Sequence, residues 1–64
     1  MPVITIRLME GRTLEQKREL TKVISEAVAR IANTPLAGVH VIFENVPRVD
    51  WGLGGILFAD RDPR

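Results

Sequence analysis

The first twelve residues, Met1–Arg12, read MPVITIRLMEGR, and this stretch decides how the rest of the chain folds. Val3–Ile6 are four consecutive β-branched residues, which predicts a strand over about Val3–Leu8. Isoleucine and leucine at the even positions alternate with Thr5 and Arg7, so one face of this strand is strongly apolar. A glycine before the closing arginine then turns the chain.

A single helix is predicted to follow this strand. Thr13 and Gln16 have the spacing of a capping box, and Asn33 and Pro35 are expected to end the helix near Asn33. Ser25 is assigned to its polar, solvent-facing side, as a surface serine without a base to activate it. Residues at intervals of three and four form one apolar stripe: Leu20, Val23, Ile24, Ala27, Val28 and Ile31.

A second strand is predicted over Val39 to about Val46, with apolar residues on both faces. Strand, helix and strand form a β-α-β unit, whose strands are expected to be parallel with a right-handed crossover. After it, Gly54–Gly55 separates two short apolar segments and predicts a tight β-hairpin that packs on a neighbouring subunit. The residues from Asp60 to Arg64 are polar and are expected to fray.

The composition indicates a small α/β protein of one domain, residues 1–64, that is completed by oligomerisation. Two strands do not make a stable sheet, and without cysteine no disulfide compensates for the short chain. With His40 as the only histidine, no metal cluster is expected. The net charge of +1 favours neither nucleic acid nor an anionic membrane as a partner. No apolar run approaches the ~20 residues of a membrane span and no signal-peptide pattern opens the chain, so a cytoplasmic location is expected.

Pro2 is the first candidate for chemistry. If Met1 is removed, as is usual before a small residue, the chain begins with a secondary amine. An α-amino group titrates at about 7.7–8.0 in a model peptide, and burial lowers its pKa by disfavouring the charged form. Such an amine is a usable general base. The alternative is a proline that merely begins an edge strand.

Arg12 is the second candidate, but it stands at the opposite end of the predicted strand. Ten residues of strand span roughly 33 Å, so one subunit cannot bring Pro2 and Arg12 together. An antiparallel neighbour would allow Arg12 of one copy to reach Pro2 of another. The alternative is a surface arginine that pairs with Glu10 or Glu15.

Several motifs give the chain a resemblance that covers Pro2 to about Leu57. Besides Pro2 they are L-x-E-G-R-T-x-E-Q-K from Leu8 to Lys17, S-E-A-V from Ser25 to Val28, P-L-x-x-V from Pro35 to Val39, and W-G-L-G-G from Trp51 to Gly55. With them the chain resembles the 4-oxalocrotonate tautomerase (2-hydroxymuconate tautomerase) family of the tautomerase superfamily. The resemblance implies a β-α-β protomer with a C-terminal hairpin, assembled as a hexamer of three dimers.

The resemblance also implies an activity in aromatic catabolism, without metal or cofactor. The N-terminal proline, here Pro2, would move a proton between the 2-hydroxyl oxygen and C-5 of a 2-hydroxymuconate-like dienoic acid. Arg12 of a neighbouring subunit would bind the distal carboxylate of this small-molecule substrate, since a bidentate arginine suits a carboxylate. Trp51 and Leu53 would form the apolar wall that keeps the proline amine neutral.

His40 departs from the family pattern, in which an arginine begins the second strand. An imidazole is shorter, has no fork and is only partly charged at neutral pH. Three explanations stay open: His40 is a weaker catalytic stabiliser, a different subunit type in a mixed hexamer supplies the arginine, or Arg48 or Arg7 reaches in. The non-functional alternative to all three is that His40 is a strand residue packed at a subunit interface.

Two other functions are also considered. A haloacrylate hydratase or dehalogenase of the same superfamily would need a further arginine and a carboxylate where this chain has Met9 and Leu53. A subunit of a mixed hexamer that is inactive or weakly active alone is the other, and the missing second arginine favours it.

Overall fold

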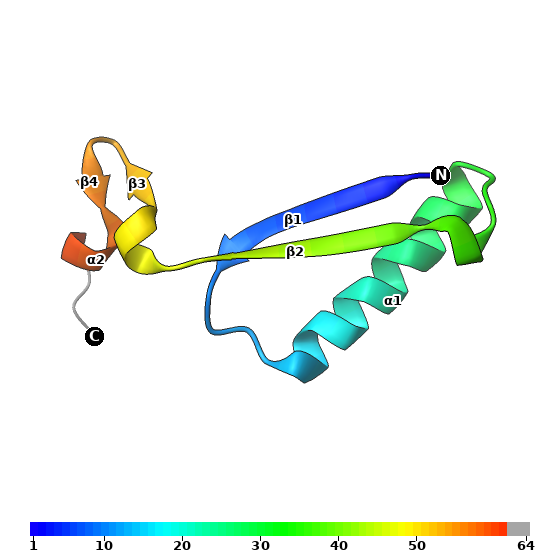
Figure 1. The fold of residues 1–64 in the computed structure, drawn as a ribbon, viewed down its shortest axis with the longest axis horizontal. Helices are drawn as coiled ribbons and strands as arrows, with labels where there is room; N and C mark the ends of the chain where they lie inside the picture. The colour runs from blue at the N-terminus through cyan, green and yellow to red at the C-terminus, as the bar shows by residue number, and fades with distance from the viewer. Residues whose placement is uncertain (62–64) are drawn as a thin grey trace.

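The computed structural model describes residues 1–61 and shows a β-α-β unit with a small hairpin beyond it (Figure 1). Strand β1, Val3–Met9, pairs in parallel with strand β2, His40–Val46, and helix α1, Leu14–Ile31, connects them. The predicted β-α-β fold with parallel strands is therefore confirmed. The remaining elements are short: η1 Leu36–Gly38, η2 Arg48–Asp50, β3 Gly52–Leu53, β4 Ile56–Leu57 and α2 Phe58–Arg61.

Both strand boundaries differ by one residue from the prediction. β1 continues to Met9 rather than Leu8, because Met9 is still paired with Val46 in the ladder. β2 begins at His40 rather than Val39, because the Val39 amide donates to the Leu36 carbonyl and closes η1 instead.

The sheet has one covered face and one open face. Ile4 pairs with Val41 and Ile6 with Phe43, and these side chains are half-buried on the side that α1 crosses. Figure 1 shows α1 lying along one side of the two strands. The opposite face is exposed and carries three paired positions: Val3 with His40, Thr5 with Ile42, and Arg7 with Glu44.

Local hydrogen bonds define both ends of α1. The capping box is present: the Thr13 hydroxyl accepts from the Gln16 amide at 3.1 Å, and the Thr13 amide donates to the Gln16 side chain at 2.9 Å. The helix ends at Ile31, two residues before the predicted end. Asn33 has φ +55° and leaves the helical conformation, while the Thr34 amide donates to the Ala29 carbonyl at 3.0 Å.

The apolar stripe of α1 is only partly covered by the sheet. Ile24 and Val28 are half-buried, whereas Leu20, Val23 and Ile31 are exposed. Ser25 was predicted at the solvent-facing side, and this is wrong: it is 9% exposed and is the residue classed as buried within residues 1–61. Ser25, a small residue, therefore lies on the covered side of the helix.

The C-terminal hairpin is confirmed. β3 and β4 pair antiparallel, with Leu53 opposite Ile56. The two-residue loop has φ +63° at Gly54 and +87° at Gly55, values that suit glycine and the turn of a tight hairpin. The predicted frayed tail is corrected in part, because Asp60 and Arg61 belong to α2, and its other residues lie outside the described range.

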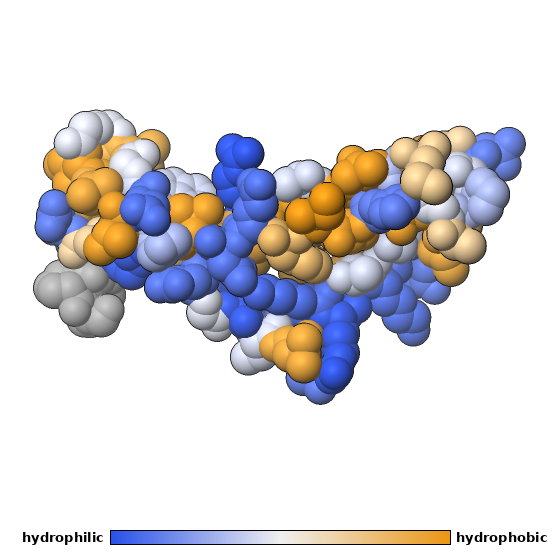
Figure 2. All heavy atoms as spheres, viewed as in Figure 1, coloured by the Kyte–Doolittle hydropathy of each residue, from blue (hydrophilic) through white to orange (hydrophobic). Residues whose placement is uncertain are grey.

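The chain is elongated and has little interior. Its radius of gyration is 15.1 Å, whereas a compact domain of this length has about 11 Å. Within residues 1–61 no apolar side chain is classed as buried. Figure 2 shows hydrophobic residues gathered over β1 and β2 and again over the hairpin. None of the described helices is long and apolar enough to cross a bilayer.

Candidate active site

Pro2 and His40 lie side by side at one end of the sheet. The His40 amide donates a hydrogen bond of 2.9 Å to the Pro2 carbonyl, directly before the Val3–His40 pair of the ladder. On the open face of the sheet, to which His40 also belongs, Val3 and Ile42 are 58% and 49% exposed. Met1 precedes them and is 90% exposed, so its peptide bond to Pro2 is within reach of an aminopeptidase.

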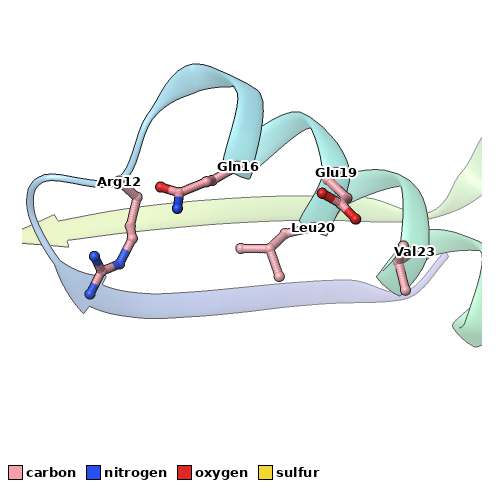
Figure 3. Close-up of a pocket in the computed structure, with 5 residues that line it drawn as sticks. All are labelled: Arg12, Gln16, Glu19, Leu20 and Val23. Carbon is pink, nitrogen blue, oxygen red and sulfur yellow. The ribbon is translucent and has the colours of Figure 1, made fainter.

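Arg12 lies at the other end of β1, in the turn that leads into α1. Gly11 makes this turn with φ +116°, a value that side chains rarely tolerate. Arg12 lines a hollow of about 380 Å³ together with Gln16, Glu19, Leu20 and Val23. In Figure 3 the side chains of Arg12 and Leu20 point toward β1.

This hollow joins the permanent positive charge of Arg12 and the carboxylate of Glu19 to an apolar floor. Leu20 and Val23 form the floor and are 37% and 55% exposed. Glu15, one of the two partners considered for Arg12, instead bonds to Arg18 at 3.1 Å. A guanidinium placed beside uncovered apolar side chains suits a carboxylate or the surface of another subunit.

Trp51 and Leu53 lie in the hairpin region, beyond the end of β2. The Trp51 ring is stacked on Phe58, with ring centroids 5.8 Å apart and an angle of 14° between the planes. Arg61 donates to the Leu53 carbonyl and lies over the Phe58 ring. Leu53 is 57% exposed, so the proposed apolar wall is open on one side in this chain.

The two arginines considered as substitutes for His40 are held near the far end of the sheet. Arg7 Nε donates to Glu44 Oε1 at 2.7 Å, and this hydrogen bond, with the attraction between the charges, raises the pKa of Arg7. Arg48 Nη2 donates to the Phe58 carbonyl at 2.7 Å. Neither contact brings a guanidinium to Pro2 of the same chain.

One chain thus contributes two separate halves of the predicted site. Pro2 and His40 are together, whereas Arg12 and the hairpin with Trp51 are at the opposite end of the sheet (Figure 1). The sequence prediction did not include Phe58 or the hydrogen bonds of Arg48 among the site features. Both depend on the folding of the hairpin, and no sequence motif marks them.

Comparison with known proteins decides the family. The sequence profile of a family described as "Tautomerase enzyme" matches residues 2–61. This chain belongs to the tautomerase family. It is an isomerase of the 4-oxalocrotonate tautomerase type, as its sequence and structural relatives show.

Three relatives illustrate how similar this tautomerase is to known proteins. The 2-hydroxymuconate tautomerase of Stutzerimonas stutzeri is 44% identical over 55 residues, which are 86% of this chain and 87% of that protein. A crystal structure of a 4-oxalocrotonate tautomerase homologue has a TM-score of 0.92 and 40% identity, covering 97% and 98% of the two chains. A heterohexamer 4-oxalocrotonate tautomerase from Chloroflexus aurantiacus has a TM-score of 0.90 and 40% identity, covering 97% and 100%.

Proposed function

We propose that this tautomerase interconverts the enol and keto forms of a 2-hydroxymuconate-like dienoic acid, with the amine of Pro2 as general base and acid. Removal of Met1 exposes that amine. The amine takes the proton of the 2-hydroxyl group, the enol becomes a ketone, and the proton is delivered to C-5. Each transfer needs a positioned group whose pKa is near the working pH.

The single observation that carries this proposal is the hydrogen bond between the His40 amide and the Pro2 carbonyl. It ties the Pro2 carbonyl to the first residue of β2, and so supports a defined place on the sheet for the first residue of the trimmed chain. A flexible N-terminus would not hold its amine in the geometry that proton transfer requires. The similarity to a 2-hydroxymuconate tautomerase supports the choice of substrate.

The proposal requires several copies of the chain. Arg12 would come from a neighbouring copy and bind a substrate carboxylate, while Trp51 and Leu53 would close the apolar wall. The uncovered apolar residues of α1 and of the open sheet face give each copy a reason to associate. We propose a homo-hexamer, a trimer of dimers, as the assembly that contains complete sites.

The first experiment combines intact mass with a ketonisation assay. We expect a mass short by one methionine residue and turnover of 2-hydroxymuconate without added metal or cofactor. Replacement of Pro2 by alanine leaves a primary amine, and we expect it to lower kcat at least tenfold, because general acid–base groups contribute about 10²–10⁴-fold. Full activity in Pro2→Ala protein, or in protein that retains Met1, would contradict the proposal.

A second candidate function is a subunit of a mixed hexamer that is weakly active alone. His40 supports it, since the imidazole lacks the permanent forked charge of an arginine beside the base. The similarity to a heterohexamer tautomerase also supports it. A purified homo-oligomer with trimmed Met1 but little activity, which gains activity when mixed with a second tautomerase chain, would favour this function.

A further inference from the structure

Arg48 connects three parts of the chain that are far apart in sequence. Its Nη2 donates to the Phe58 carbonyl at 2.7 Å, and its Nη1 lies 3.5 Å from the Met9 sulfur. Both contacts are partly buried. One guanidinium therefore bridges the end of β1 and the beginning of α2, while its own backbone belongs to η2.

Phe58 in turn holds Trp51. The Phe58 amide donates to the Trp51 carbonyl at 2.8 Å, and the two rings are stacked. The Trp51 amide also donates a hydrogen bond of 3.5 Å to the Arg48 carbonyl. Trp51 thus contacts the Arg48 backbone directly, and it contacts Phe58, whose own carbonyl accepts from the Arg48 side chain.

The hairpin needs contacts with the rest of the chain because its own strands are short and bury little apolar surface. β3 and β4 have two residues each, and Leu53, Ile56 and Leu57 are all exposed. A two-stranded hairpin of this size is not stable by itself in water. Met9 is the last residue of β1, three residues before Arg12. The contact between the Arg48 guanidinium and Met9 therefore links the hairpin to the part of the chain that leads into the Arg12 turn.

We propose that Arg48 is a positioning residue, which sets the place of Trp51 relative to β1 through the backbone of Phe58. The inference rests on the proposed function only in taking Trp51 as part of the substrate-binding wall. Arg48 does not touch substrate in this proposal. An apolar wall binds the substrate and the transition state about equally, so at a pH where the Pro2 amine is neutral its displacement raises KM more than it lowers kcat.

The chain offers a direct probe, because Trp51 is its only tryptophan and it has no tyrosine. The test compares Arg48→Met with Arg48→Lys and with the control Arg18→Met, which removes a surface guanidinium bonded to Glu15 on α1. Lysine keeps the charge and can still donate one hydrogen bond, but it cannot bridge two partners as the fork does. The readouts are Trp51 emission and acrylamide quenching without substrate, kcat and KM with 2-hydroxymuconate, and sedimentation.

We expect Arg48→Met to shift the Trp51 emission and to raise its quenching constant about twofold, with KM raised about tenfold and kcat changed less than threefold. Arg48→Lys should lie between, and Arg18→Met should match the wild type. Unchanged Trp51 emission in Arg48→Met would overturn the proposal. If KM were raised while the emission stayed unchanged, Arg48 would bind the substrate directly instead of positioning Trp51.

Arg48→Lys keeps the test decisive if Arg48→Met does not assemble. It keeps the positive charge but cannot bridge the Met9 sulfur and the Phe58 carbonyl as the guanidinium does. We expect a shifted Trp51 emission and a raised KM, whereas wild-type values of both would overturn the proposal. The fluorescence arm needs no substrate, so an inactive wild type would contradict the proposed function while leaving the Arg48 test valid.

Discussion

The His40 amide and the Pro2 carbonyl are joined by a hydrogen bond of 2.9 Å, and this pair lies at the end of the sheet opposite to Arg12. The chain therefore carries its proposed base and its proposed carboxylate clamp on two separate ends. The seven residues of β1 keep them apart, because a paired strand is rigid along its length. A complete site then requires the ends of different copies to meet.

This separation predicts complementation between two inactive variants. Pro2→Ala removes the base and Arg12→Ala removes the clamp, and each should lose most of its activity. When the two are unfolded together and refolded, we expect activity to return in about a quarter of the sites, because in a symmetric assembly each site draws the two residues from different copies. The measurement is kcat per chain against the ratio of the two variants.

The control for complementation is a mixture of the two variants without unfolding, which should stay inactive while the oligomers do not exchange. A variant with both substitutions, mixed with either single variant, should also stay inactive. No recovery in the refolded mixture, with the oligomer restored, would mean that Pro2 and Arg12 do not share a site across copies.

His40 is expected to limit the rate with a dicarboxylate substrate. Replacing it by arginine places a permanent, forked charge beside Pro2, where a charged hydrogen bond contributes about 1.5–3 kcal/mol. We expect His40→Arg to raise kcat/KM for 2-hydroxymuconate roughly tenfold. His40→Gln, which can donate a hydrogen bond but carries no charge, is the matched control and should not exceed the wild type.

Removal of the Thr13 cap of α1 is expected to lower the free energy of unfolding while leaving the proposed site residues in place. Thr13→Ala removes the acceptor of the Gln16 amide, which costs about 1 kcal/mol in comparable helices. Thr21→Ala in the same helix is the control, because its hydroxyl only donates to the Lys17 carbonyl within the helix. Urea unfolding at a fixed protein concentration should show a lower midpoint for Thr13→Ala alone, and equal midpoints would contradict the role of the cap.

Local patterns predicted most of the fold because their causes are local. The capping box of Thr13 and Gln16, the end of the helix near Asn33 and the Gly54–Gly55 loop each depend on a few neighbouring residues. Parallel pairing of the strands followed from a β-α-β order, for which few topologies exist.

The mistakes concern orientation and distant contacts. Ser25 was placed on the wrong side of the helix. It is buried and the adjacent Ile24 is half-buried, so a small rotation of α1 decides which of these two residues is covered more fully. The stack of Trp51 on Phe58 and the bridge from Arg48 depend on the path of the hairpin, which no periodic pattern specifies. The length of β1 puts Pro2 and Arg12 at opposite ends of the strand within one chain, as the sequence predicted, while their roles in a site stay predictions.

The last prediction concerns the surface on which the copies meet. Val23 is 55% exposed and lines the hollow with Arg12, so a second copy that covers this hollow would bury it. Val23→Asp places a carboxylate in this hollow, and a second copy that covers it takes the charge out of water at a cost that a contact with Arg12 offsets only in part. We expect Val23→Asp to sediment as smaller species and to lose activity, since dissociation separates Arg12 of one copy from Pro2 of another.

Lys22→Asp, an exposed neighbour outside this hollow, is the control and should keep the wild-type assembly. An intact, active oligomer of Val23→Asp would show that the copies meet on another surface, and the open sheet face with Val3 and Ile42 would then be the next to test.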